Sequence, residues 1–291
     1  MRSGNVRGAV NIACYGLGHG DVVSIQKRPS CLLVLNQGLG IGGAIFDHVA
    51  FVGGQIPEGV RGTVDNIRRI AKEEGRDPTH IKVVVGINVI VAATDKEARA
   101  KREDYLKYVD TEGALALFGG WTGIDLSGYA DDDDFRFSDS PRVQSVVQHW
   151  SSTVPGTDNF PWTKRRIVEY LSIGGLGAKI VGGPTTVADE LERWVDVADV
   201  DGFNLAHIVN PGTFEDIIEY LLPELERRGI YTKKVEKEGA TAREVIFGSS
   251  RLPEDHPGSK YKWRAGEKIP TYQLGEEGSG DNVRKDVANE A

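Results

Sequence analysis

The hydrophobic pattern of residues 178–229 predicts a strand, a helix, a second strand and a second helix in succession. Residues 178–181 and 203–206 are short apolar runs, which are typical of buried parallel strands. The first run ends at a Gly-Gly-Pro turn, and Thr185 or Thr186 is then placed to cap a helix. Apolar residues recur at helical spacing at Val187, Leu191, Trp194 and Val195, and again at Phe214, Ile217, Ile218, Leu221 and Leu222 after the opening 211–213 turn.

The same alternation extends toward the N-terminus. The pattern predicts strands at 30–37, 49–53 and 81–93, a helix at 60–74, and a charged helix from an N-cap at Thr94 or Asp95 to about residue 108. Strands that alternate with helices along the chain are typical of an α/β fold with a parallel sheet. In a closed barrel of this kind, the loops that follow the strands form the functional rim.

The pattern changes between Gly113 and Arg166, where a Gly-rich segment, an acidic run and short aromatic segments replace the alternation. A structureless loop of this length is uncommon in a compact domain. We therefore expect a long insertion at 113–166 that forms a lid, a pocket wall or an oligomer contact.

The number of predicted strands is too small for a closed barrel. The pattern yields about five strands, whereas a (β/α)₈ barrel has eight. We expect the C-terminal part of a barrel with its N-terminal strands missing. The strand edges that this leaves unpaired favour association, so a homo-oligomer is an open expectation.

Composition is that of an ordinary globular protein, with 40% hydrophobic and 27% charged residues. The 43 acidic residues outnumber the 35 Lys and Arg residues, which argues against a nucleic-acid partner. The longest apolar stretch, 81–93, is too short to span a membrane, and the first residues do not form an apolar signal region. We therefore expect a soluble, cytoplasmic protein.

Metal and disulfide chemistry find little support in the sequence. Cys14 and Cys31 have no His at metal-ligand spacing and read as ordinary reduced thiols. The acidic run Asp131–Asp134 contains the oxygen ligands that Ca²⁺ and Mg²⁺ prefer, but it lacks the alternating spacing of a Ca²⁺ loop. A solvated acidic loop is the better interpretation, and no metal is expected.

The Gly-rich segment Gly38–Gly43 matches G-x-G-x-x-G after an apolar run, with Glu58 at a distance resembling that of a ribose-binding acid. Residues 44–48 are too short for the helix that a Rossmann unit needs before its next strand. A generic turn or a phosphate loop fits better, and a nicotinamide-dinucleotide-binding protein is the weaker alternative.

Single residues do not identify a reaction. His207 follows a predicted strand, where a barrel places catalytic side chains, although a polar residue at a strand end explains it equally simply. Asn204, flanked by apolar residues, is expected to hydrogen-bond inside the barrel. Trp121, Thr122 and Asp125 fit either a pocket or a structural turn, so the catalytic residues stay unknown.

Several segments together resemble one family. They are VRGAVNI (6–12), EEGRDPTHIKVVVGINVIVAATDKEARAK (73–101), EGALALFGGWTGIDLSGY (112–129), IGGLGAKIVGGPTTVADELERWV (173–195), VDGFNLAHIVNPGTFEDIIEYLLPELERRGIY (200–231) and RLPEDHP (251–257). This set resembles the nitrilotriacetate, dibenzothiophene-sulfone and long-chain-alkane monooxygenase branch of the bacterial luciferase-like flavin enzymes. The match covers most of residues 58–264 in order.

The resemblance implies a TIM-barrel monooxygenase, an oxidoreductase that takes reduced FMN from a separate flavin reductase and uses O₂ to oxygenate a small organic substrate. The family binds the FMN phosphate with a Gln-Ala-Gly-Ser-Ser motif, and the nearest match here is 36–40. Gln37, Gly38 and Gly40 are therefore the candidate cofactor-binding residues, although both hydroxyls of the motif are absent.

The resemblance also divides the chain into three parts. Residues 1–48 are expected to be a divergent remnant of the middle of the barrel, 49–264 to be the C-terminal barrel units with their insertion, and 265–291 to be a polar, disordered tail. Because early strands and two motif hydroxyls are missing, a non-catalytic fragment or interaction module is the main alternative to an active flavoprotein.

Overall fold

The computed structural model describes residues 11–13, 22–25, 49–154, 157, 159–232, 238–256 and 258–259. The predicted strand at 30–37, the Gly38–Gly43 segment and the predicted tail at 265–291 lie outside the described residues.

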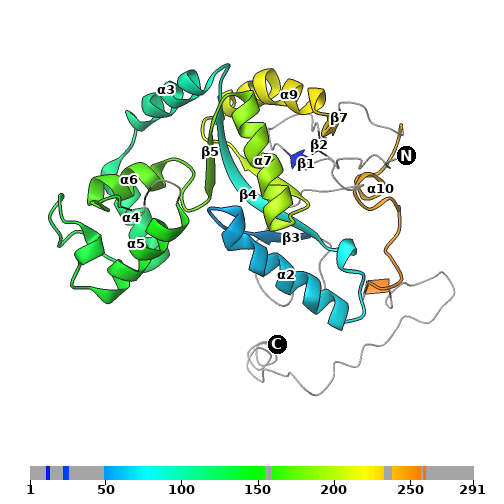
Figure 1. The fold of residues 1–291 in the computed structure, drawn as a ribbon, viewed down its shortest axis with the longest axis horizontal. Coiled ribbons are helices and arrows are strands. Elements are labelled where there is room, and N and C mark those ends of the chain that lie inside the picture. The colour runs from blue at the N-terminus through cyan, green and yellow to red at the C-terminus, as the bar shows by residue number, and fades with distance from the viewer. Residues whose placement is uncertain are drawn as a thin grey trace, which may run out of the picture.

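A mixed sheet forms the centre of the molecule (Figure 1). Its seven strands are β1 (Asn11–Ala13), β2 (Val22–Ile25), β3 (Val49–Val52), β4 (Lys82–Val91), β5 (Ala178–Gly182), β6 (Gly202–Ala206) and β7 (Tyr231–Thr232). The order is β3-β4-β6-β1-β2-β7, and β5 also pairs with β4. The pairs β3/β4, β4/β5, β4/β6 and β1/β6 are parallel, whereas β1/β2 and β2/β7 are antiparallel. Within the described residues this order does not close into a ring.

Strand β4 is a central strand of the sheet, because β3, β5 and β6 all pair with it in parallel. Its residues 84–88 pair with β6. Residues 82–85 pair with β3 and residues 87–91 pair with β5. Since both of these stretches overlap the β6 stretch, β3 and β5 must lie end to end on the opposite edge of β4. Nine of its ten residues are buried, which explains its nearly continuous apolar sequence.

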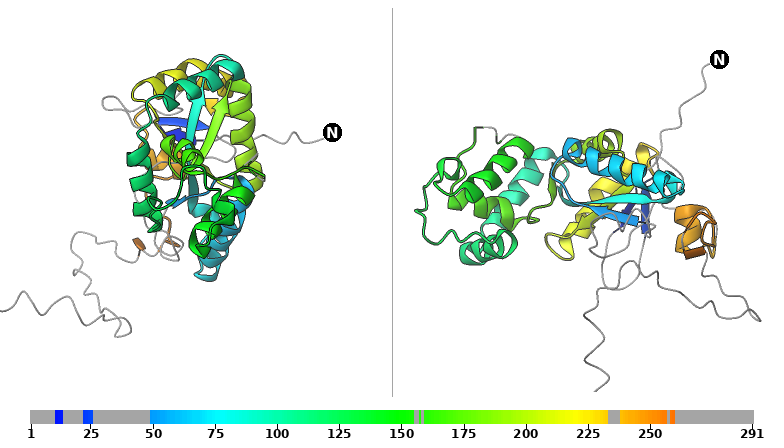
Figure 2. Two further views of the ribbon diagram at one scale, coloured as in Figure 1. Left: turned by 90° about the vertical axis from the view of Figure 1, so that its left-hand side faces the viewer. Right: turned by 90° about the horizontal axis from the view of Figure 1, so that it is seen from below.

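Helices surround this sheet and form a separate lobe beside it (Figures 1 and 2). Their bounds are α2 (Pro57–Glu73), η1 (Pro78–His80), α3 (Asp95–Leu106), α4 (Thr111–Thr122), η2 (Phe135–Phe137), α5 (Pro141–Thr153), α6 (Lys164–Ser172), α7 (Pro184–Ala198), α8 (Gly212–Asp216), the π-helix η3 (Ile217–Leu221), α9 (Leu222–Arg227) and α10 (Ala242–Phe247). Helices α2 and α7 pack against each other and, together with α8, η3 and α9, bury the main core against the sheet. Within the described residues, none of these helices combines the length and apolar character needed to cross a bilayer.

The lobe consists of α4, η2, α5 and α6, which lie in the chain between β4 and β5. Its core is aromatic and distinct from the main core, with Phe118, Phe135, Trp150 and Trp162 all buried. The ring centroids of Trp150 and Trp162 lie 5.0 Å apart, and the Trp162 indole N–H donates to Ser151 Oγ at 2.9 Å. Residues 111–172 thus form a helical lobe with a core of its own beside the sheet (Figure 1), and its interpretation as an insertion stays a prediction.

Most predicted elements are confirmed, but one cap is wrong. The Thr94 hydroxyl accepts from the Glu97 amide at 3.2 Å, as expected for an N-cap of α3. Helix α7 instead begins at Pro184 with Gly183 as N-cap, and the Thr185 and Thr186 side chains do not cap it. Proline at the first helical position has the right φ and needs no amide partner. The Gly183 amide donates to Asp95 Oδ1 at 2.6 Å, so the cap comes from another helix.

Candidate functional site

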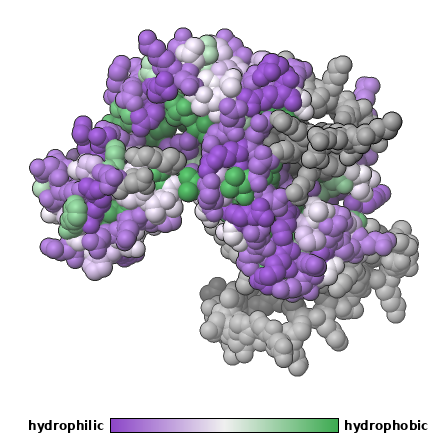
Figure 3. Space-filling model, in the orientation of Figure 1, coloured by the Kyte–Doolittle hydropathy of each residue, from purple (hydrophilic) through white to green (hydrophobic). Residues whose placement is uncertain are grey.

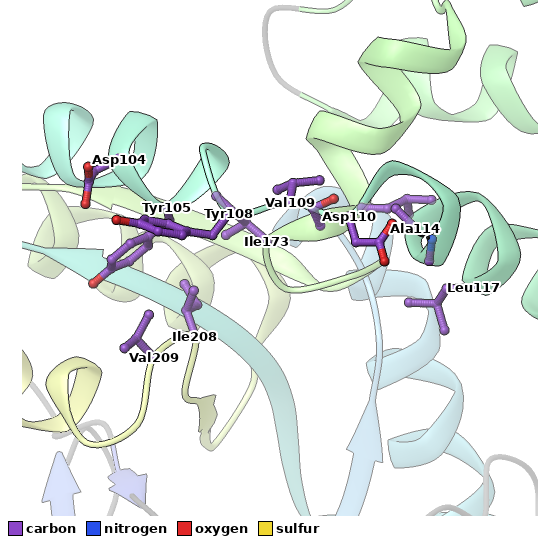
Figure 4. Close-up of a pocket in the computed structure, with 13 residues that line it drawn as sticks. Asp104, Tyr105, Tyr108, Val109, Asp110, Ala114, Leu117, Ile173, Ile208 and Val209 are labelled. Carbon is purple, nitrogen blue, oxygen red and sulfur yellow. Dashed lines mark hydrogen bonds between the residues drawn. The ribbon is translucent and has the colours of Figure 1, made fainter.

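A pocket of about 630 Å³ lies where α3, α4, α6 and the loop after β6 meet. Figure 4 shows Tyr105 and Tyr108 near Ile208 and Val209, with Ala114 and Leu117 on the side formed by α4. The lining consists of Asp104, Tyr105, Tyr108, Val109, Asp110, Gly113, Ala114, Leu117, Leu171, Ser172, Ile173, Ile208 and Val209. In the surface view, hydrophobic residues gather at the junction between the lobe and the sheet (Figure 3).

The pocket lies at the carboxyl end of β6. Ile208 and Val209 follow this strand directly, and the amides of both donate to Thr213 Oγ1 at 3.1 and 3.0 Å. These bonds fix the loop against the start of α8. The carboxyl ends of parallel strands are where α/β barrels bind their ligands.

Three polar side chains on the lining have partners inside the protein. Asp110 caps α4 and accepts from the amides of Glu112 and Gly113 at 3.0 and 3.2 Å. Asp104 pairs with Lys107 at 2.9 Å, and the Ser172 hydroxyl donates to the Val168 carbonyl at 2.6 Å. The lining is thus an apolar surface with a few hydrogen-bonded groups, as in most small-molecule sites.

Asn88 supports the floor of the pocket from β4. Its side chain is only 7% exposed, and its amide nitrogen donates to the carbonyls of Gly174 and Ala178, both at 3.1 Å. Gly174 has φ +74°, and a Cβ there would lie 2.4 Å from Asn88 Cγ. The close approach of Asn88 and Gly174 therefore sets the path of the loop that follows Ile173, a lining residue.

Lys179 on β5 holds the other side of the same loop. Its ammonium donates to the carbonyls of Gly175 and Gly177 at 2.6 and 3.2 Å and lies 3.9 Å from the centroid of the Tyr170 ring. Burial, with a smaller contribution from Arg102, lowers the pKa of Lys179 to about 7. The two carbonyls and the ring offset part of the cost of desolvating the ammonium.

This lowered pKa predicts a pH-dependent stability. Between pH 7 and 10.5 the unfolded chain holds a proton on Lys179 that the folded chain has released, so the free energy of unfolding rises with pH. Relative to a Lys179→Met variant, we expect the wild type to gain up to about 1.4 kcal/mol per pH unit. Urea denaturation at pH 7.5 and 9.5 measures the change, with the exposed Lys96→Met as control. An equal difference between wild type and Lys179→Met at both pH values would contradict the prediction.

The cofactor candidates from the sequence, Gln37, Gly38 and Gly40, lie outside the described residues and stay predictions. His207 lies at the end of β6, is exposed and has its ring centroid 5.9 Å from that of Phe214. It is not among the residues that line the pocket. His207 therefore precedes the lining residue Ile208 without lining the pocket itself.

The lobe residues singled out in the sequence have structural contacts. Trp121 lies against Gly175, the Thr122 hydroxyl donates to the Phe118 carbonyl at 2.7 Å, and Asp125 accepts from the Ser127 amide at 2.8 Å. In the acidic run, Asp131 pairs with Lys164 and Asp134 pairs with Arg136. The described part of the chain contains no group of His, Cys, Asp and Glu side chains arranged to hold a metal ion.

Sequence reasoning missed the residues that build the pocket. Tyr105 lines the cavity, and burial, Asp216 and Asp104 raise its pKa. Asn88 carried a visible signal, because a lone amide interrupts an otherwise apolar strand. A buried polar side chain needs hydrogen-bond partners, and here they are the carbonyl of Gly174 in the loop before β5 and that of Ala178 at the start of β5.

Parallel strands β3, β4, β5 and β6 backed by helices, with a pocket where a strand ends, are consistent with a TIM-barrel-like domain. The chain belongs to the luciferase-like monooxygenase family, whose model matches residues 36–199. The resemblance seen in the sequence is thereby confirmed.

Individual relatives agree with this assignment. The chain is 41% identical to the long-chain alkane monooxygenase of Geobacillus thermodenitrificans over 214 residues, which are 73% of this chain and 43% of the relative. The crystal structure of DmoA from Hyphomicrobium sulfonivorans superposes with a TM-score of 0.67 at 35% identity, covering 78% of this chain and 47% of that one. Riboflavin lyase, solved with modified FMN and its substrate riboflavin, gives a TM-score of 0.60 at 29% identity, covering 77% and 48%. The chain thus spans less than half the length of these relatives.

Proposed function

We propose that this chain forms part of a reduced-FMN-dependent, two-component monooxygenase that uses O₂ to oxygenate a small organic substrate. A separate flavin reductase would supply the reduced cofactor. The observation that carries the proposal is the apolar pocket at the carboxyl end of β6 in a luciferase-like chain. The similarity to a lyase solved with modified FMN supports the choice of flavin.

The pocket suits an organic substrate or a flavin ring, but it does not suit the flavin phosphate. Its aliphatic and tyrosine side chains suit an organic substrate or a flavin ring. A phosphate needs cations or free backbone amides, and the described lining contains two carboxylates and no Lys or Arg. The pocket is therefore not a phosphate site. We assign the phosphate to the predicted Gln37–Gly40 segment, which lies outside the described residues.

The residues of the pocket have roles that their contacts support. Tyr105, Ile173 and Ile208 give the cavity wall apolar surface, against which an organic group of the substrate would be buried. Asn88 and Lys179 hold the loop next to Ile173 in place. The flavin supplies the oxygen chemistry, and the protein contributes binding, orientation and a dry site.

Anaerobic titration of the purified chain with reduced FMN tests the proposal. We expect saturable binding followed by flavin fluorescence, and no saturation with NADH. The variant Gly38→Asp adds a negative charge to the predicted phosphate segment, so it should weaken FMN binding more than binding of riboflavin, which has no phosphate. Soluble, folded protein that binds neither flavin would overturn the flavoprotein assignment.

The alternative is a non-catalytic chain that depends on another polypeptide. One observation favours it: the sheet order does not close within the described residues. Flavin binding without turnover in the presence of a reductase would support this alternative. Turnover by the isolated chain would exclude it.

A further inference from the structure

The charges around the pocket restrict what it can bind. Among the described lining residues, the acidic side chains are Asp104 and Asp110, and none is Lys or Arg. The nearby cations are already paired. Lys107 binds Asp104 at 2.9 Å, and Lys101, one turn before Tyr105, binds Asp216 at 2.6 Å. A bound anion would therefore find no unpaired cation on the described lining.

The pKa of the lining residue Tyr105 also reflects the carboxylates near the pocket. Burial first, and then Asp216 and Asp104, raise the pKa of Tyr105, so its phenol stays neutral near physiological pH. Asp104 and Asp216 are themselves paired with Lys107 and Lys101, so neither pair leaves a positive charge for an anionic ligand. The Asp110 carboxylate accepts hydrogen bonds from two backbone amides of α4 and likewise offers no positive charge to an anion.

The remaining walls are aliphatic and come from three directions: Ala114 and Leu117 from α4, Leu171 and Ile173 from α6 and its loop, and Ile208 and Val209 from the β6 loop. Each methylene that a ligand buries against such walls contributes about 0.8 kcal/mol. A charged group that loses its water there without a partner is strongly disfavoured. The aliphatic walls and the lack of a cation on the described lining thus both favour a neutral, apolar ligand.

We propose that this pocket selects neutral, mainly apolar substrates and rejects substrates that carry a carboxylate. The inference rests on the proposed function in that it treats the pocket as the substrate site of the monooxygenase. It narrows the substrate to molecules such as hydrocarbons, thioethers or alcohols, whose reacting carbon or sulfur carries no nearby anionic group.

Direct binding of matched probes tests this selectivity without flavin. Isothermal titration of the full chain at pH 7.5 compares 1-octanol with octanoate, which have equal chain lengths and differ in charge. We expect 1-octanol to bind at least about tenfold more tightly, a difference of about 1.4 kcal/mol. Equal or tighter binding of octanoate, or no binding of either probe, would overturn the proposal.

A cation added to the lining tests whether the two probes bind in this pocket. Leu117 is 43% exposed on α4, so Leu117→Arg can be accommodated in the helix and brings a cation to the pocket. This variant should reverse the preference toward octanoate. Val245→Arg on α10, 39% exposed and outside the lining, should leave the preference unchanged. An unchanged preference in Leu117→Arg, with helicity intact by circular dichroism, would show that the probes bind elsewhere. Because the flavin titration does not use the pocket probes, the two proposals can fail separately.

Discussion

Replacing Asp201 by alanine is expected to lower the free energy of unfolding by about 3–5 kcal/mol, the range for breaking a buried ion pair from one side. The Asp201 side chain is 4% exposed and binds Arg68 Nη2 at 2.5 Å. It also accepts from the Val83 amide at 2.9 Å, and Lys82 Nζ lies 4.0 Å away. Without this carboxylate, the buried Lys82 loses an ion-pair partner, and the partly buried Arg68 keeps only its longer pair with Asp199 at 3.9 Å among the ion pairs of the described residues.

The expected loss is large because Asp201 joins three elements. It precedes β6, binds the backbone of β4 through Val83, and pairs with Arg68 of α2. Arg68 in turn donates to the carbonyls of Pro78 and Ile81, which lead into β4. The start of the β4/β6 pair and the helix that covers it therefore depend on one carboxylate.

Urea denaturation followed by circular dichroism measures this loss, with Asp65→Ala as the matched control. Asp65 pairs with Arg61 on the surface, where both side chains are about half exposed, so its removal should cost less than about 1 kcal/mol. Asp201→Asn keeps the shape and part of the hydrogen bonding and should fall between the two. Similar losses for Asp201→Ala and Asp65→Ala would show that the network around Asp201 contributes no more to the free energy of unfolding than a surface ion pair.

Asp201 also illustrates what the sequence could predict. Local patterns gave β3, β4, β6, α2 and α3 within a few residues, because apolar periodicity and caps such as Thr94 act over short separations. Beside them, Asp201 looks only like a turn residue before a strand. Its partner Arg68 lies 133 positions away, and no local rule connects the two. The cap of α7 was misplaced for the same reason, since it comes from Asp95.

The sequence indicates the strand end beside which the pocket lies, but not the side chains that line the pocket. The predicted strand that ends at 206 leads into the lining residues Ile208 and Val209, on the side where barrels place their sites. The side chains that close the cavity come from α3, α4 and the end of α6, and nothing in the sequence alone brings these segments together. Their meeting depends on how the lobe packs against the sheet. Gln37, Gly38 and Gly40 remain predictions from the resemblance.

The floor of the pocket should be the second most sensitive place. Gly174→Ala is expected to cost about 2–4 kcal/mol, because alanine at φ +74° is strained and its Cβ would overlap the Asn88 side chain. The loop beside Ile173 would have to move, so binding of 1-octanol should weaken as well. Gly128→Ala is the matched control, since an added Cβ there meets no atom within 4 Å.

A double-mutant cycle separates strain from overlap. Asn88→Ala alone loses the two amide hydrogen bonds to Gly174 and Ala178 and leaves room above the glycine. In that background Gly174→Ala should pay only for the backbone strain, so the combined loss should be smaller than the sum by about 1 kcal/mol or more. Additive losses would mean that Asn88 and Gly174 do not restrain each other. A coupling of the expected sign, accompanied by a joint loss of 1-octanol binding, would identify Asn88 as the residue that positions the pocket floor from within the sheet.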